Sequence, residues 1–157
     1  MNDQAWTKSA RSEQFIELMG RHLEEDGLPR IAGRLMGALL LSASPRSLDE
    51  LTEGLAVSKA SISSNARLLD VLGVVEKVTV PGDRRDYYQI SDDALRRILL
   101  RQMERSRLLL DRLDVGMAAV PDSRPELQRR LASWAEFMGR MTGRLEEELE
   151  GAQSEQR

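Results

Sequence analysis

The feature that most constrains the fold is a change in hydrophobic period near residue 74. On either side of residues 74–90, apolar residues recur every three to four positions, which is typical of amphipathic helices. Within this stretch, Val74–Val80 alternates and is rich in β-branched residues, Pro81-Gly82-Asp83 is typical of a turn, and Tyr87–Ile90 forms a second run. The chain is therefore predicted to be mainly helical with one small β-hairpin.

Two helices are predicted near the start of the chain. Apolar spacing gives the first over about 11–25, and the second follows Pro29, which is favoured in a first helical turn. Gly33 and Gly37 lie four residues apart, and therefore on one face of the second helix. Two glycines on one face would let another helix approach closely.

Two short helices come next, and both begin at a capping residue. Ser47 followed by Glu50 has the pattern of a capping box, which predicts a helix over 48–55. Ser58 is a second N-cap candidate and predicts a helix over about 59–72. Two short helices followed by a β-hairpin are typical of a winged helix-turn-helix domain.

Two long helices are predicted after the hairpin. Ser91 caps the first, over 92–120, and a proline-bounded break separates it from the second, over 126–150. Their apolar residues step alternately by four and three, which is typical of helix–helix seams. A small domain cannot cover helices of this length, so they must pair with each other, with the first helix or with a second subunit. The stripes are Leu99, Met103, Ser106, Leu110, Leu113, Met117 and Val120, and then Leu127, Leu131, Trp134, Met138, Met141 and Leu145.

The expected architecture is mainly α with a small β-hairpin wing: a winged helix-turn-helix with long dimerisation helices. We expect an N-terminal dimerisation helix in residues 1–28, the winged helix-turn-helix in 29–91, and a long helical hairpin for dimerisation in 92–157. In such a domain the second short helix enters the major groove of double-stranded DNA, and the hairpin tip reaches the adjacent backbone or minor groove.

The 59–72 helix has the side chains that a groove-reading helix needs. Ile62, Ala66 and Leu69 are predicted to face inward, which leaves small hydroxyls and positive groups for phosphates and base edges. A serine-rich face is also found on ordinary solvated helices, and arginines at a turn are often surface charge. The order of the elements favours DNA contact. The predicted contacts are Ser58, Lys59, Ser61, Ser63, Ser64, Arg67, Lys77, Arg84 and Arg85.

The net charge of −3, taken as a single sum, argues against a polyanionic partner. The charge is unevenly distributed, however, because residues 1–29 hold 3 basic and 6 acidic side chains, whereas residues 30–100 hold 10 and 9. A local basic face is therefore compatible with an acidic chain.

Catalysis and metal binding have little support in the sequence. The chain has no cysteine and one histidine, His22, beside glutamates on a predicted helix, so neither a thiolate nor a histidine cluster is available. No nucleotide-binding or nucleophile motif is present. We expect a non-enzymatic protein without a cofactor or metal. The longest apolar run is four residues, so we expect no membrane span and a cytoplasmic location.

Several motifs resemble the MarR superfamily of bacterial transcription regulators. They are Leu48–Leu51, Leu55–Ser63 and Leu68–Val75. The wing Val80–Tyr88 and the stretch Gly27–Arg34 are similar to the GbsR-like branch. The resemblance implies a homodimer with interlocked terminal helices that binds a palindromic operator. It also implies repression or activation relieved by a small ligand, which is choline in the namesake regulators of the branch.

The resemblance also implies roles for residues of the wing, and this chain differs from the usual family sequence in the turn before the second short helix. It implies that Asp83 braces the wing and that Arg85 reaches DNA, with Arg84 as a second phosphate contact. The family usually has glycine in the turn between the two DNA-binding helices, whereas this chain has Ala56. We expect this turn to be strained or reshaped.

Large apolar residues in the terminal helices allow two interpretations. They form the core of the dimer, or they line a pocket between the dimer helices and the winged helix, where aromatic rings hold a cationic or apolar effector. The candidates for this pocket are Phe15, Met19, Met103, Trp134, Phe137 and Met138. A rival function for the whole chain is a winged helix that binds protein instead of DNA, with the long helices as an assembly stalk.

Overall fold

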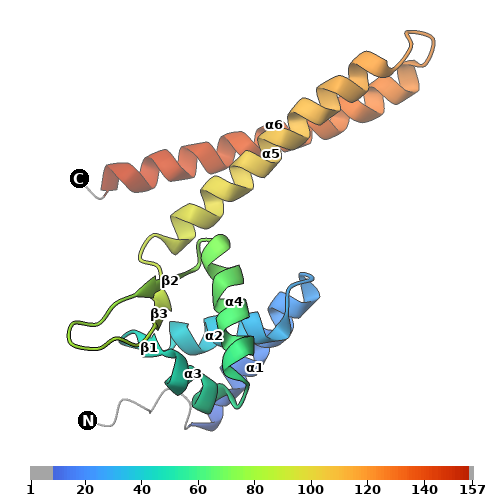
Figure 1. Ribbon diagram of the computed structural model, residues 1–157. Coiled ribbons are helices and arrows are strands. Elements are labelled where there is room, and N and C mark those ends of the chain that lie inside the picture. Colours follow the sequence, from blue (N-terminus) through green and yellow to red (C-terminus); the bar gives the residue numbers. More distant parts are fainter. Residues whose placement is uncertain (1–8, 156–157) are drawn as a thin grey trace. The chain divides into compact units, whose positions relative to one another are not determined.

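The computed structural model describes residues 9–155 and consists of helices with one small sheet (Figure 1). Residue contacts divide the chain into two compact units, Met1–Ala94 and Leu95–Arg157. The elements in chain order are α1 (Ala10–Glu25), α2 (Arg30–Leu40), β1 (Arg46–Ser47), α3 (Leu48–Leu55), α4 (Lys59–Val71), β2 (Val75–Val78), β3 (Tyr87–Ile90), α5 (Ala94–Ala119) and α6 (Pro125–Glu155).

The predicted elements are present, with differences at their ends. The first hairpin strand is shorter than predicted and spans Val75–Val78. The prediction that Ser91 caps α5 is wrong, because the helix begins at Ala94. The Ser91 hydroxyl instead donates to carboxylate oxygens of Glu76, at 3.2 Å, and Asp93, at 2.7 Å.

The wing is part of a three-stranded antiparallel sheet in the order β1-β3-β2. In the hairpin, Val75 pairs with Ile90 and Val78 with Tyr87. On the other side of β3, Arg46 of β1 pairs with Tyr88. The sequence did not indicate β1, because a two-residue strand is too short to show a period.

One hydrophobic core holds the first unit together. It is formed by apolar side chains from α1 to α4 and from β2 and β3, and it includes all three residues of α4 that we predicted to face inward. Its fully buried members include Leu35 of α2, Leu51 of α3, Ile62 and Leu69 of α4, and Val75 of β2.

The first two helices approach each other closely at the predicted glycine face. A Cβ atom placed on Gly33 would lie only 2.2 Å from the Met19 carbonyl oxygen of α1, and one on Gly37 would lie 3.1 Å from Met19 Cβ. The first distance is far below any real contact of a Cβ atom. Gly33 is therefore required by this packing, as the spacing of the glycines predicted.

The second unit is a hairpin of α5 and α6. Arg107 of α5 forms an ion pair with Glu146 of α6, and a Cβ on Gly116 would lie 3.6 Å from Leu131 Cδ1. The stripe of α5 is covered, whereas Trp134 and Met141 of the α6 stripe are exposed. Within residues 9–155, no helix is both long enough and apolar enough to cross a membrane.

The glycine contact gives a prediction about stability. Gly33→Ala should lower the free energy of unfolding by about 3 kcal/mol, because the backbone of α1 must move to admit the methyl group. Thermal unfolding followed by circular dichroism measures this loss. Gly139→Ala is the control: a Cβ there meets nothing within 4 Å, and alanine should raise stability by up to about 1 kcal/mol. Equal effects of the two substitutions would contradict the packing requirement.

Candidate nucleic-acid interface

Side-chain caps fix the starts of both short helices. The Ser47 hydroxyl accepts from the Glu50 amide at 3.3 Å, and the Glu50 carboxylate accepts from the Ser47 amide at 2.8 Å. This is the predicted capping box. The hydroxyl of Ser58 accepts from the Ser61 amide at 3.2 Å and caps α4, also as predicted. These bonds satisfy amides that a helix N-terminus leaves without partners.

The turn between α3 and α4 contains a strained residue. Ala56 has φ 53° and ψ 45°, the left-handed conformation. Its amide donates to the Glu53 carbonyl, and the Val57 amide donates to the Thr52 carbonyl, so α3 closes tightly. Left-handed backbone is unfavourable for any residue with a Cβ. The strain expected from alanine in place of the usual glycine is therefore present.

The outer face of α4 carries the predicted serines and cations. Ser58, Lys59, Ser64 and Arg67 are exposed, and Ser61 and Ser63 are half-buried. The Ser64 hydroxyl donates to carbonyls of its own helix, at 3.0 Å and 3.2 Å. In the described part of the chain, no hydrogen bond engages the hydroxyls of Ser61 and Ser63.

One polar residue of α4 was not predicted to be buried. Asn65 is 8% exposed, and its side-chain amide donates to the Ser61 carbonyl at 2.8 Å. Its Oδ1 has no hydrogen-bond partner in the described structure. Asn65 lies three residues after Ile62 and four before Leu69, so helical spacing alone could have placed it on the inward face.

The wing contains a compact cluster of Asp83, Arg85 and Tyr87. The Arg85 guanidinium donates to both carboxylate oxygens of Asp83, with Nη2 2.5 Å from Oδ2 and Nε 3.1 Å from Oδ1. It also donates to the Tyr87 hydroxyl at 2.7 Å, and that hydroxyl donates to Asp83 at 2.8 Å. The Arg85 amide donates to Asp83 Oδ1 at 2.9 Å. Asp83 thus holds both the backbone and the side chain of Arg85.

This cluster shifts the titration of its members. The hydrogen bonds from Arg85 hold the pKa of the Asp83 carboxyl well below its usual range, and the bond to Asp83 raises the pKa of the Arg85 guanidinium. The hydrogen bond to Asp83 also raises the pKa of Tyr87. Asp83 therefore remains an anion, and Arg85 a cation, across the physiological range.

Two other predicted cations are also paired with aspartates. Lys59 forms an ion pair with Asp49 of α3. Lys77 Nζ lies 2.8 Å from Asp86 Oδ1, and this hydrogen bond raises the pKa of the lysine. Arg67 and Arg84 are exposed and form no ion pair with the described residues.

The residues predicted to line a ligand pocket fall into both units. Phe15 and Met19 are half-buried in the first unit. In the second, Met103 is buried, Met138 is half-buried, and Trp134 and Phe137 are exposed.

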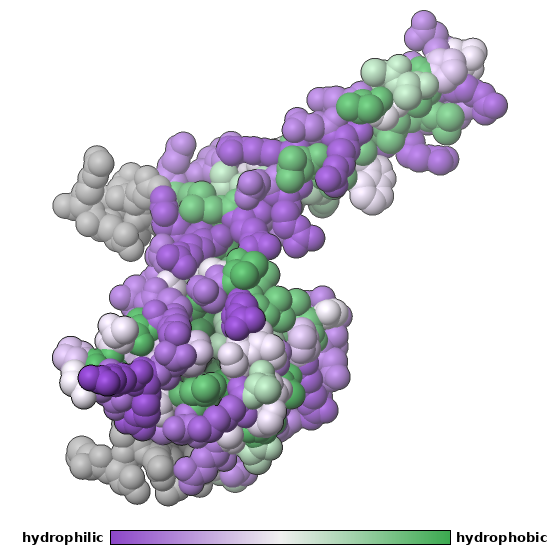
Figure 2. All heavy atoms as spheres, viewed as in Figure 1, coloured by the Kyte–Doolittle hydropathy of each residue, from purple (hydrophilic) through white to green (hydrophobic). Residues whose placement is uncertain are grey.

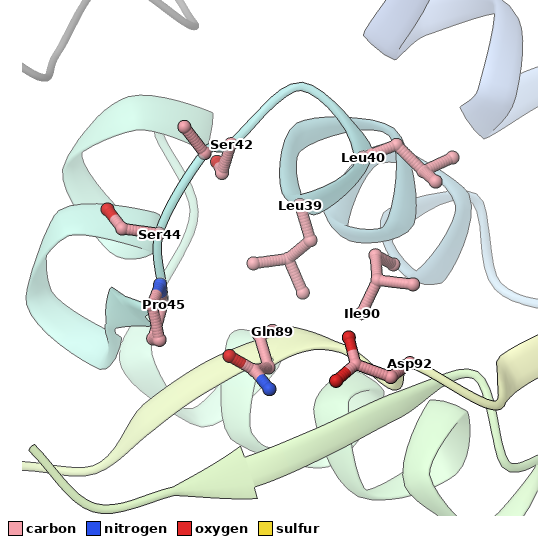
Figure 3. Close-up of a pocket in the computed structure, with 9 residues that line it drawn as sticks. Leu39, Leu40, Ser42, Ser44, Pro45, Gln89, Ile90 and Asp92 are labelled. Carbon is pink, nitrogen blue, oxygen red and sulfur yellow. The ribbon is translucent and has the colours of Figure 1, made fainter.

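A different hollow of about 240 Å³ lies in the first unit (Figure 3). It includes none of the six predicted pocket residues. Two of its polar side chains already form hydrogen bonds within the protein: Gln89 donates to Glu76 at 2.7 Å, and Ser42 donates to the Ala38 carbonyl at 2.8 Å. This hollow is smaller than most ligand pockets. Its lining is Leu39, Leu40, Ser42, Ala43, Ser44, Pro45, Gln89, Ile90 and Asp92.

Within the described residues, no group of three or more His, Cys, Asp or Glu side chains could hold a metal ion. In the first unit, exposed serines and cations lie on α4 and on the wing. Two capped helices joined by a tight turn and followed by a β-hairpin define a winged helix-turn-helix protein.

Comparison with known proteins identifies the family. The MarR family matches residues 26–86. The HTH-type transcriptional regulator MmpR5 of Mycobacterium tuberculosis is 37% identical over 129 residues, which cover 82% of this chain and 78% of that protein. The crystal structure of a transcriptional regulator, 34% identical, has a TM-score of 0.76 over 92% of this chain and 98% of its own. This chain belongs to the MarR family.

A second relative shares a shorter region. The HTH-type transcriptional repressor OpcR of Bacillus subtilis is 31% identical over 81 residues, which cover 52% of this chain and 44% of that protein. Members of the MarR family are DNA-binding transcriptional regulators and not enzymes. The prediction that this chain is a DNA-binding transcriptional regulator and not an enzyme is therefore confirmed by the family.

The strained turn gives a second prediction. Ala56→Gly should raise the free energy of unfolding by about 1 kcal/mol, because glycine adopts the left-handed conformation without the steric cost of a Cβ. Chemical denaturation with urea measures the gain. Ala60→Gly, inside α4, is the matched control and should lower stability by about 1 kcal/mol. A loss of stability in both variants would show that the Ala56 turn is not strained.

Proposed function

We propose that this chain acts as a homodimer that represses or activates transcription from a palindromic operator in the cytoplasm. In each subunit, α4 reads the major groove and the wing contacts the neighbouring backbone or minor groove. The observation that carries the proposal is the joint position of α4 and the wing in one packed unit. Ile62 and Leu69 of α4 share one hydrophobic core with Val75 of β2 and Tyr88 of β3. The two elements are therefore close enough to act on one DNA site.

An exposed apolar stripe on α6 supports the homodimer. Trp134, Phe137 and Met141 are 61%, 55% and 43% exposed, and their steps of three and four residues place them on one face of the helix. Figure 2 shows apolar atoms exposed among polar ones along the hairpin. Exposed apolar patches of this kind mark association surfaces. Members of the MarR family form dimers, so the proposed partner for this surface is a second copy of the chain.

Control by a small ligand is a further part of the proposal. The predicted lining residues are aromatic rings and methionines, which are the side chain types that suit a cationic or apolar effector. The same side chains would also serve as the core of a dimer. The similarity of Gly27–Arg34 and Val80–Tyr88 to the GbsR-like branch supports a choline-like effector for this site.

The central experiment is a gel-shift titration with the promoter immediately upstream of the gene for this chain, together with the solution mass of the free protein. We expect a dimer that shifts this fragment at low salt and loses affinity steeply as salt rises. Footprints on two half-sites should lie one helical turn, roughly 34–36 Å, apart. A dimer that shifts no promoter DNA at low salt would instead favour the protein-binding module.

The two wing arginines should contribute differently. Arg85→Ala and Arg84→Ala should each weaken binding to all sequences, and each should flatten the salt slope by about one unit. The loss should be larger for Arg85→Ala, because it leaves the Asp83 carboxylate unpaired beside the DNA. The double variant Asp83→Ala/Arg85→Ala should recover part of that difference. Arg112→Ala, an exposed arginine of α5, is the control, and an unchanged slope in Arg85→Ala would remove its phosphate contact.

The serines of α4 should determine sequence preference. Ser61→Ala or Ser63→Ala should change the relative affinity for base substitutions at one operator position by roughly tenfold, because a base-edge hydrogen bond is lost. Competition binding with a set of singly substituted operators measures the change. Ser123→Ala, an exposed serine in the turn between α5 and α6, is the control because it lies outside α4 and the wing. Uniform weakening on every operator would count against base readout.

A further inference from the structure

Arg34 of α2 connects α1 to the end of α3. Its Nε lies 2.7 Å from Glu17 Oε1 of α1, and its Nη2 donates to the Leu55 carbonyl oxygen at 3.1 Å. The Arg34 side chain is 23% exposed, so both interactions are partly shielded from water. One guanidinium therefore joins three helices, and none of its contacts belongs to the DNA-facing surface described above.

The packing of α1 makes room for this guanidinium. A Cβ placed on Gly20 would lie 2.8 Å from Arg34 Cγ and 3.2 Å from Arg30 Cγ. The missing side chain at position 20 thus lets the stems of both arginines lie against α1. Arg30 also pairs with Glu17, at 2.7 Å between Nη2 and Oε2, but within residues 9–155 it forms no hydrogen bond or ion pair with α3.

The Leu55 carbonyl is the point at which this contact affects the DNA-binding helices. Leu55 is the last residue of α3, and it directly precedes Ala56, which holds the left-handed turn into α4. Carbonyls at a helix C-terminus lack partners within the helix, and a cation there is favoured by the helix dipole. Arg34 supplies both a donor and a positive charge where the backbone is strained.

We propose that Arg34 is a positioning residue for DNA recognition: held by Glu17, it stabilises the left-handed turn at Ala56 and thereby fixes α4 relative to α3. This inference rests on the proposed DNA-binding function. It gives α1 an indirect role in DNA recognition, because Glu17 of α1 holds Arg34, although α1 has no predicted DNA contact. Without the contact, the binding-competent turn is populated for a smaller fraction of the time, and the apparent affinity falls by that fraction.

The test compares Arg34→Ala and Arg34→Lys with Arg30→Ala in the full-length protein. Arg30 forms an ion pair of the same length with the same carboxylate. Arg30→Ala therefore removes one positive charge and one α1–α2 contact but leaves the bond from Arg34 to the Leu55 carbonyl in place. We expect roughly tenfold weaker binding to the upstream promoter duplex for both Arg34 variants. For Arg30→Ala we expect less than a twofold change. Equal losses for the Arg34 and Arg30 variants would overturn the proposal.

Rescue by glycine at the turn separates positioning from general destabilisation. In the Ala56→Gly background the turn no longer depends on the donor from Arg34, so Arg34→Lys should weaken binding less than threefold. An undiminished tenfold loss in that background would overturn the proposal. If Arg34→Ala does not fold, the comparison of Arg34→Lys with Arg30→Ala tests the proposal.

A readout independent of DNA distinguishes failure of this inference from failure of the proposed function. Amide hydrogen exchange at Ala56 and Val57 should be several-fold faster in Arg34→Lys than in Arg30→Ala, and Ala56→Gly should reduce that difference. If the wild-type protein binds no promoter DNA but shows this exchange pattern, the role of Arg34 at the turn stands and the regulatory function falls. Identical exchange in the two variants overturns the role of Arg34.

Discussion

The close contact between α1 and α2 at Gly33 is the constraint on which the first unit depends. It brings the α1 backbone to a distance that no other residue at position 33 would permit. At that distance, Glu17 reaches two arginines of α2. The helix α2 also packs against α3, α4 and β3. The contact at Gly33 therefore links α1 to the helix that supports both the helix-turn-helix and the base of the wing.

The cations that we propose to face DNA are paired locally with aspartates, which is compatible with the acidic total charge. Lys59, Lys77 and Arg85 each lie beside an aspartate on the same unit. Exposed ion pairs of this kind contribute little to stability. Under the proposed function, phosphates would therefore replace Asp49 beside Lys59 and Asp86 beside Lys77 at small cost, whereas Asp83 would keep holding Arg85. On DNA that does not fit, these aspartates would remain as negative charges that disfavour loose attachment.

Much of this fold could be predicted from local patterns in the sequence. The caps at Ser47 and Ser58 and the change of period after residue 74 each reflect short-range physical rules, and the structure follows them. The exceptions depend on tertiary neighbours. Arg46 is 2% exposed because β1 pairs with β3, and the Ser91 hydroxyl bonds to Glu76 on the hairpin. For the candidate site, residue types were predictable, but which cations carry an aspartate partner depends on the folded geometry.

The two-residue strand β1 has a mechanical consequence for the wing. It pairs with β3, and the Leu48 amide at the start of α3 donates to the Asp86 carbonyl at 3.0 Å. The base of the wing is therefore fastened directly to the first helix of the helix-turn-helix. Residues 79–86, between the paired strands, have no ladder partner in the hairpin, but the Asp83 amide donates to the Val80 carbonyl and the Arg85 amide to Asp83. Under the proposed function, the wing would therefore lose little conformational entropy on binding DNA.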